Sequence, residues 1–168
     1  NIAEHVMALI LAFTRTLHIT IKRQMEKVWE SRANLPGIEI AGETLGIIGL
    51  GSIGLQVAKR ARAFDMRLLA VDPTQTEKPD YVESLWRLDR LHDMLRQSDF
   101  VAICCPLTPE TEGMMGVAEF RAMKRTAFLI NIARGKIVDQ AALVEALRAK
   151  EIAGTGLDAT DPEPLPPD

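Results

Sequence analysis

Three glycines follow a short apolar run at a spacing that suits phosphate binding. The run is residues 45–48, and an amphipathic stretch begins after the segment Gly49-Leu50-Gly51-Ser52-Ile53-Gly54. In this G-x-G-x-x-G pattern the first glycine permits a tight turn, the second lets a phosphate approach the backbone, and the third lets a helix pack closely on a strand. The amides near Ser52 and Ile53 would face phosphates at the positive end of that helix. The pattern predicts a site for the pyrophosphate of a dinucleotide.

An acidic residue stands where such a site needs a ribose-binding group. Asp72 follows the apolar residues 68–71 and lies 18 positions after Gly54, close to the spacing of a carboxylate that accepts hydrogen bonds from ribose hydroxyls. The same charge would repel the 2′-phosphate of NADP, and the segment Pro73-Thr74-Gln75 supplies no arginine to neutralise it. We therefore expect NAD to be favoured over NADP. The alternative, that Asp72 and Pro73 only begin a turn, stays open.

The elements that must position these residues alternate along most of the chain. Short apolar runs predict buried strands at residues 45–48, 68–71, 100–104, 128–132 and 154–157. Amphipathic segments between them predict helices at residues 53–64, 88–96, 118–123 and 141–149. Such alternation implies a parallel sheet covered by helices on both faces. The expected fold class is therefore α/β, a Rossmann-type doubly wound parallel sheet.

The two ends of the chain follow other patterns. Residues 2–31 contain no Gly or Pro, and their apolar residues have helical spacing: Val6, Leu9, Ile10, Phe13, Leu17, Ile21, Met25 and Val28. One long helix is expected within residues 1–33, ended by Asn34, Pro36 and Gly37. Four prolines in residues 161–168 exclude a helix or central strand there. We thus divide the chain into a helix (1–33), a Rossmann core (42–158) and a tail (159–168).

Length and composition bound the possible functions. A chain of 168 residues fits one domain, and 47% hydrophobic with 26% charged residues argues against a disordered or fibrous protein. The net charge of −3 and scattered basic residues give no nucleic-acid surface. The apolar stretch 6–13 is too short to span a bilayer. The only cysteines, Cys104 and Cys105, are adjacent, which suits neither a disulfide framework nor a metal site. We expect a cytoplasmic protein without a metal.

Five blocks of the sequence resemble the D-isomer-specific 2-hydroxyacid dehydrogenase family, and the similarity covers essentially the whole chain. The blocks are Ala3-Glu4-His5, the segment 42–54, Cys105-Pro106-Leu107-Thr108-Pro109-Glu110-Thr111, Asn131-Ile132-Ala133-Arg134-Gly135, and Gly156-Leu157-Asp158 with Glu163-Pro164. The resemblance implies an NAD-binding domain of an oxidoreductase that acts on small D-2-hydroxy acids and 2-keto acids. It also implies a homodimer formed with the first helix, and a substrate domain outside this chain.

The resemblance assigns two catalytic residues. Arg134 would bind the carboxylate and carbonyl of the substrate, a task suited to a fixed fork of donors. It also follows strand 128–132 directly, at the carboxyl edge of the sheet where ligands of such folds bind. Glu163 would pair with a catalytic histidine and raise its pKa. That histidine is expected beyond Asp168, so the chain alone should turn over no 2-keto acid, because none of its three histidines, His5, His18 and His92, fits the role.

Further residues are assigned to the cofactor by the same resemblance. Ile132, Ala133 and Arg134 form a cofactor-binding segment, and Asp158 would bond the nicotinamide carboxamide. Cys105, Pro106 and Thr111 match a loop that lines the adenosine half, with Cys105 as a wall residue rather than a nucleophile. The chain has Ala159-Thr160 where the family commonly has Val-Phe after the aspartate, which leaves the path from Asp158 to Glu163 open.

Two other functions compete with a dehydrogenase. One is an NAD-sensing dimerisation module like the C-terminal-binding-protein corepressors, which resemble the same family and share the Arg134 and Glu163 pair. The other is a dimerisation domain that has lost cofactor binding. The intact glycines Gly49, Gly51 and Gly54, together with Asp72, argue against this second function. The sequence does not identify the 2-hydroxy acid, because the side-chain pocket would come largely from the second domain.

Overall fold

The computed structural model describes residues 1–31, 34–35 and 37–166, which contain one six-stranded sheet. Its strands are β1 (Thr44–Ile48), β2 (Arg67–Val71), β3 (Ser84–Trp86), β4 (Phe100–Ile103), β5 (Phe128–Asn131) and β6 (Gly154–Leu157). They lie in the order β3-β2-β1-β4-β5-β6, and every neighbouring pair is parallel. The direction of winding reverses between β1 and β4, and ligands of such sheets bind at the carboxyl edge near that point.

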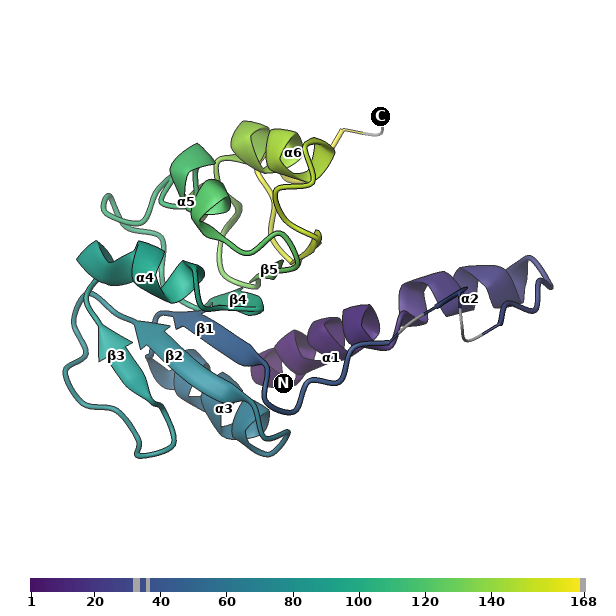
Figure 1. The fold of residues 1–168 in the computed structure, drawn as a ribbon. Helices are drawn as coiled ribbons and strands as arrows, with labels where there is room; N and C mark the ends of the chain where they lie inside the picture. The colour runs from purple at the N-terminus through teal and green to yellow at the C-terminus, as the bar shows by residue number, and fades with distance from the viewer. Residues whose placement is uncertain (32–33, 36, 167–168) are drawn as a thin grey trace.

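Helices cover both faces of the sheet (Figure 1). One face carries α1 (Ile2–Thr14) and α3 (Ser52–Arg62), which pack on each other. The other carries α4 (Leu91–Leu95), α5 (Val117–Ala122) and α6 (Gln140–Arg148). The central strand β1 is buried along its whole length, because it has helices on both faces and a strand on either side. The predicted α/β doubly wound parallel fold is confirmed.

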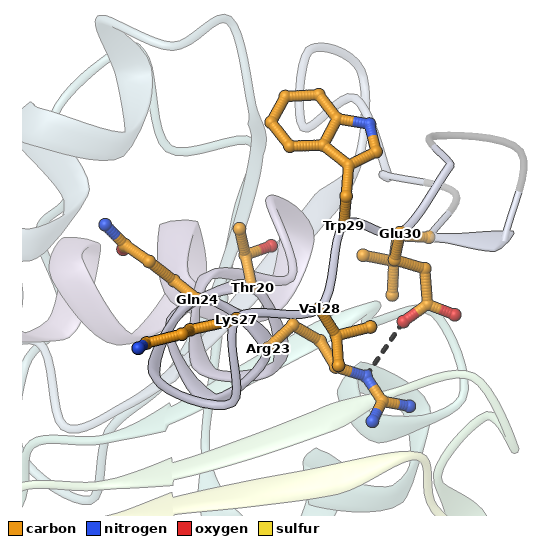
Figure 2. A pocket seen from close by; sticks show the side chains of 8 residues that line it. Thr20, Arg23, Gln24, Lys27, Val28, Trp29 and Glu30 are labelled. Atoms are coloured by element: carbon orange, nitrogen blue, oxygen red, sulfur yellow. Dashed lines mark hydrogen bonds and ion pairs between the residues drawn. The ribbon is translucent and has the colours of Figure 1, made fainter.

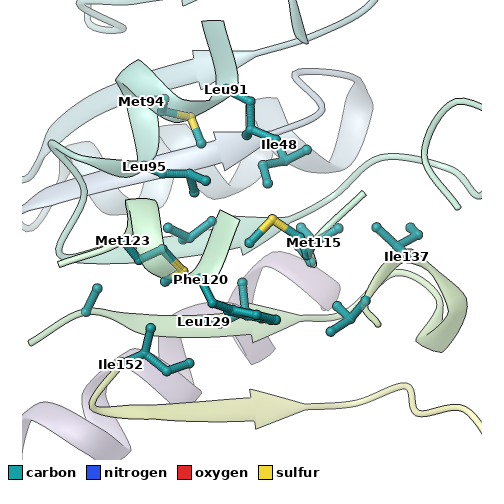
Figure 3. Close-up of a cluster of buried hydrophobic side chains, with 14 of the residues drawn as sticks. Ile48, Leu91, Met94, Leu95, Met115, Phe120, Met123, Leu129, Ile137 and Ile152 are labelled. Atoms are coloured by element: carbon teal, nitrogen blue, oxygen red, sulfur yellow. The ribbon is translucent and has the colours of Figure 1, made fainter. Parts of the chain in front are cut away.

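A hydrophobic core lies on each side of the sheet and fixes the strand ends. On one side Val6 and Ile10 of α1 pack with Val57 of α3 over the strands. On the other side, Figure 3 shows side chains of α4 and α5 directed at Ile48 and Leu129 of the sheet. Since both layers are buried, the carboxyl ends of β1, β2 and β5 are held in place by packing.

The predicted strands are confirmed with small changes in their bounds. Strands β4 and β5 end at Ile103 and Asn131, one residue earlier than expected. The predicted helix 88–96 consists of a 3-10 turn, η2 (Leu88–Arg90), followed by α4. A second 3-10 turn, η3 (Gly135–Ile137), follows β5. The sequence analysis missed β3, whose three residues are only half-buried at the edge of the sheet and form no apolar run.

The prediction of one long N-terminal helix is wrong. The structure has two helices, α1 and α2 (Leu17–Met25), that are bent by 67° relative to each other. At the break Thr16 adopts a left-handed backbone conformation, with φ of 53°. The carbonyl of Thr14, which a continuous helix would pair with residue 18, instead accepts from the amide of Ile38 at 2.8 Å. The returning chain therefore takes the acceptor that helix continuation needs.

No single helix in the described ranges is long and apolar enough to cross a membrane, although α1 and α2 taken together reach the required length and composition. The predictions that fall on residues 32, 33, 36, 167 and 168, namely the end of the first helix, its proline stop and the last tail residues, lie outside the described residues.

Candidate dinucleotide site and active site

The glycine-rich turn connects β1 to α3 and is tightly built on two sides. Gly49 has a φ of +94°, and a Cβ placed on it would lie 2.7 Å from the Cα of Cys105. A Cβ on Gly54 would lie 2.1 Å from the carbonyl oxygen of Gly49. A Cβ on Gly51 would meet no heavy atom within 4 Å. Only the middle glycine therefore faces open space, as expected of a position that a phosphate approaches.

The first turn of α3 offers donors beside that space. Leu55 is the first residue whose amide bonds back into the helix, to the carbonyl of Gly51 at 2.9 Å. The amides of Ser52, Ile53 and Gly54 precede it and have no intrahelical acceptor. Three amides at the positive end of a helix, next to an open glycine, fit the pyrophosphate of a dinucleotide.

Asp72 follows β2 and is buried, with 5% of its surface exposed. Its Oδ2 accepts from the amide of Leu50 at 2.8 Å, so the acid holds the glycine-rich turn directly. Its Oδ1 accepts from the amides of Thr74 and Gln75, both at 2.8 Å, and from the Thr74 hydroxyl at 3.0 Å. Burial opposes the charge, but these hydrogen bonds outweigh it and lower the pKa of Asp72. The carboxylate is thus ionised at neutral pH, and Oδ2 keeps a lone pair for a ligand.

The structure adds a cation that the sequence analysis did not find near Asp72. Arg87 follows β3, and its guanidinium Nη1 donates to the carbonyl of Pro73. The residues that follow Asp72 along the chain, Pro73-Thr74-Gln75, contain no arginine. Because β3 was not predicted, the arginine that it brings to this loop from 15 positions away was missed.

The loop after β4 is held by one threonine. Thr111 is buried; its hydroxyl donates to the carbonyl of Pro106 and accepts from the amide of Thr108, both at 2.8 Å. Pro106 itself is exposed at the carboxyl edge. Burial raises the pKa of the Cys105 thiol to about 11, so this thiol stays protonated at neutral pH, and Cys105 packs closely on Gly49.

The turn after β5 presents Arg134. Asn131 is fully buried, and its side chain accepts from the amide of Ala133 and donates to the carbonyl of Arg134, both at 3.0 Å. This residue was not among the predicted site residues, although a polar side chain ending an apolar strand is a usable signal. Ile132 points into the core. The side chain of Arg134 is exposed, and in the part of the chain that the structure describes it forms no ion pair.

The tail crosses the turn that carries Arg134. A Cβ on Gly135 would lie 2.1 Å from the backbone carbon and oxygen of Thr160, so the two segments touch at this glycine. The amide of Asp161 is held by the side chain of Gln140 at 3.3 Å. Glu163 is exposed beyond this crossing. The segments of Arg134 and Glu163 are therefore brought together, but their side chains form no ion pair within residues 1–31, 34–35 and 37–166.

Asp158 lies at the end of β6, beside the turn of β5. Its amide donates to the carbonyl of Asn131 at 2.9 Å. Its exposed carboxylate lies 3.6 Å from Nε2 of His5 on α1. The other histidines lie elsewhere: His18 packs edge-on against Phe13, and His92 pairs with Glu119 at 2.9 Å. Gly51, Asp72, Arg134 and Asp158 thus all lie in turns that follow the carboxyl ends of parallel strands.

Comparison with known proteins identifies this arrangement. The family model described as "D-isomer specific 2-hydroxyacid dehydrogenase, NAD binding domain" matches residues 7–168. A glyoxylate reductase of Korarchaeum cryptofilum is 42% identical over 170 residues, covering 99% of this chain and 51% of that protein. The chain spans about half the length of the curated relatives of this kind.

Solved structures agree with the family match. The NAD-dependent formate dehydrogenase of Staphylococcus aureus, in complex with NAD, has a TM-score of 0.89 and 33% identity, covering 99% of this chain and 50% of that one. A D-isomer specific 2-hydroxyacid dehydrogenase of Xanthobacter autotrophicus Py2, in complex with NADPH, has a TM-score of 0.88 and 31% identity, covering 99% and 67%. These comparisons give no support to the corepressor alternative. The chain belongs to the D-isomer specific 2-hydroxyacid dehydrogenase family and matches its NAD-binding domain.

Proposed function

We propose that the intact protein is an NAD-dependent oxidoreductase that interconverts a small D-2-hydroxy acid and the corresponding 2-keto acid. The observation that carries this proposal is Arg134. It is an exposed arginine without an acidic partner among the described residues, and it stands at the same carboxyl edge as the glycine-rich turn, on the far side of β4. Its Nη1 donates to the carbonyl of Ala133 at 2.8 Å, and the remaining donors of the guanidinium can bind a carboxylate through two parallel hydrogen bonds.

The chain's own residues would hold the cofactor and orient the acid. The amides of Ser52 and Ile53 would hold the pyrophosphate, Asp72 the adenosine ribose and Asp158 the nicotinamide carboxamide. When bound, NAD accepts or supplies the hydride. Arg134 would bind the substrate carboxylate and stabilise negative charge that develops on the carbonyl oxygen.

The proton is the remaining requirement. Reduction of a ketone needs a proton for the developing alkoxide. Glu163 would hold a histidine, supplied from outside residues 1–168, in the tautomer and charge state that can give this proton. The segment that carries Glu163 crosses the Arg134 turn at Gly135, which would place the proton donor near the bound acid.

The test is NADH oxidation by the intact protein with glyoxylate, pyruvate and hydroxypyruvate as substrates. We expect turnover with at least one of these acids, and loss of turnover in Arg134→Ala with little change in NADH affinity. A matched control is Lys136→Ala, which removes an exposed cation two residues further on. If none of the acids is reduced, or if both variants behave alike, the proposed reaction is wrong.

We further propose that the protein is a homodimer that uses α2 and the segment after it. In this region Met25 is 80% exposed and Trp29 is 98% exposed, and Figure 2 shows the Trp29 ring projecting from the segment that follows α2. A cavity of about 450 Å³ in this region is lined by residues that include Arg23, Val28 and Trp29. Apolar surface of this kind, on a helix that projects from the body (Figure 1), is normally covered in the assembled protein.

Sedimentation velocity at micromolar concentration tests the dimer. We expect the wild type to be dimeric and Ile21→Ser combined with Met25→Ser to shift it toward monomer, since both residues are exposed on α2. A monomeric wild type would contradict the proposal. A cytoplasmic location stays a prediction from the sequence.

A further inference from the structure

Arg87 is placed beside Asp72 by the backbone of the sheet. Strands β2 and β3 are parallel, with Val71 paired to Trp86. The amide of Asp72 then donates to the carbonyl of Trp86 at 2.9 Å, which extends the pairing by one step. Asp72 and Arg87 are therefore the next residues of two neighbouring strands, at the same carboxyl edge. This placement depends on strand register and not on a side-chain rotamer.

The guanidinium of Arg87 has donors to spare. One nitrogen donates to the carbonyl of Pro73, in the loop that follows Asp72. The side chain is exposed, and within the described ranges it has no acidic partner. The guanidinium does not donate to the Asp72 carboxylate, whose donors are the three amides and the hydroxyl already named. A guanidinium carries five N–H donors, so Arg87 keeps N–H donors that a ligand at this edge can use.

Arg90, and Arg67 at the opposite end of β2, differ from Arg87 in this respect. Arg90 lies over the Trp86 ring, with 5.6 Å between its central carbon and the ring centroid, and pairs with Asp93. Arg67 pairs with Glu83 at 2.6 Å. Both are occupied by acidic residues of the chain itself. Arg90 is therefore a matched control, since it is exposed and lies three residues from Arg87.

We infer that Arg87 is a cofactor-specificity residue, which supplies a cation for the 2′-phosphate of NADPH beside the acid that disfavours it. NADP differs from NAD only by a phosphate on the 2′-oxygen of the adenosine ribose, the sugar that Asp72 is proposed to hold. Arginine suits phosphate because it can donate two parallel hydrogen bonds. Discrimination between the cofactors is then the difference between repulsion by Asp72 and attraction by Arg87. The inference rests on the proposed position of that ribose.

The experiment measures dissociation constants of NADH and NADPH for the intact protein by cofactor fluorescence. We expect the wild type to favour NADH. In Arg87→Ala the Kd of NADPH should rise about tenfold, as for loss of a charge-assisted hydrogen bond, while the Kd of NADH stays within about twofold. Arg90→Ala should change neither constant. Asp72→Ala should reduce the difference between the affinities for NADH and NADPH. In the double variant Asp72→Ala with Arg87→Ala, the affinity for NADPH should again fall while that for NADH stays as in Asp72→Ala.

Two results would overturn the inference. Equal weakening of NADH and NADPH by Arg87→Ala would mean that the side chain only holds the Pro73 loop. No effect on either cofactor would mean that Arg87 is a solvated surface residue. Salt adds a further readout, because NADPH affinity should fall more steeply with ionic strength in the wild type than in Arg87→Ala. A failure of 2-keto acid turnover would overturn the proposed reaction and leave these binding results standing.

Discussion

Two regions of the same sheet edge handle their charged groups in opposite ways. At the adenosine end, formed by β1 and β2, Asp72 is buried and accepts three amide hydrogen bonds from its own chain. At the substrate end, formed by β5 and β6, the side chains of Arg134, Asp158 and Glu163 are all exposed. In both regions the charges come after parallel strands of the sheet. They differ in how far the chain satisfies the carboxylate or guanidinium: Asp72 accepts four hydrogen bonds, whereas Arg134, like the exposed Arg87 at the adenosine end, keeps donors for a ligand.

The difference indicates how the two halves of the site reach a working geometry. A carboxylate fixed by backbone amides has lost its freedom on folding, so it costs little further entropy when a ligand arrives. An exposed arginine orders only when its partner binds, and it depends on the turn beneath it for position. Asn131 provides that position through hydrogen bonds to Ala133 and Arg134. Folding thus already positions the carboxylate at the adenosine end, whereas at the substrate end hydrogen bonds hold the backbone turn and the charged side chains are exposed.

The largest expected effect is at the substrate end. Arg134→Ala in the intact protein should lower kcat/KM for the 2-keto acid by about 10³-fold, the scale for loss of a preorganised donor to developing charge. The free energy of unfolding should change little, because the side chain is exposed. Steady-state kinetics and thermal unfolding measure the two quantities. A large drop in stability would show that the substrate end is not the open region described above.

At the adenosine end, Gly51 and Gly54 should respond differently to alanine. Gly54→Ala forces a Cβ to within 2.1 Å of a backbone oxygen and should cost about 1–3 kcal/mol of stability, as overpacking does. Gly51→Ala has free space and an ordinary φ of −74°, so stability should hold while NADH affinity falls about ten- to a hundredfold. Calorimetry and fluorescence titration check the pair. Equal loss of stability in both variants would contradict the open position of Gly51.

Asp72→Asn should lower stability by about 1–3 kcal/mol at pH 7, because an amide nitrogen cannot accept the hydrogen bonds that the carboxylate accepts. The pKa of Asp72 is lowered by folding, so its contribution is complete above the unfolded value of about 3.9 and is lost as pH falls through the lower folded value. The difference between wild type and variant should therefore be constant near neutral pH and shrink below about pH 4.

Urea unfolding at several pH values measures this difference. Asp65→Asn is the control, because Asp65 is exposed and forms a long 3.5 Å ion pair with Arg62, and such pairs contribute little. A difference that grows in acid would have the wrong sign for a carboxylate stabilised in its charged form.

The same comparison shows what the sequence could predict. The turn from β1 to α3 was found because its glycines and apolar run are local in the chain, and Asp72 because it ends a buried strand at a regular distance. Arg87, Asn131 and the contact at Gly135 were missed as site features. Arg87 and Gly135 act on segments far away in sequence, so no short pattern marks them. The break at Thr16 is of the same kind, since the amide that bonds the Thr14 carbonyl there belongs to Ile38, 24 positions after Thr14.

The smallest change in stability is expected from Gly135→Ala, although its new Cβ lies as close to backbone atoms as that of Gly54→Ala. In both variants the new Cβ would lie 2.1 Å from backbone atoms. Gly54 meets a buried turn that cannot move without separating β1 from α3. Gly135 meets Thr160 in a tail whose following residues are exposed, and such a segment can shift outward with little loss of burial. The stability cost should therefore stay below about 1 kcal/mol.

Gly135→Ala should instead affect turnover, because an outward shift of the tail moves Glu163. We expect kcat to fall and its pH profile to change, while the Kd of NADH stays constant. A stability loss equal to that of Gly54→Ala, in parallel urea titrations, would show that the tail is as firmly held as the glycine-rich turn, and the contrast between the two regions would not extend to the backbone.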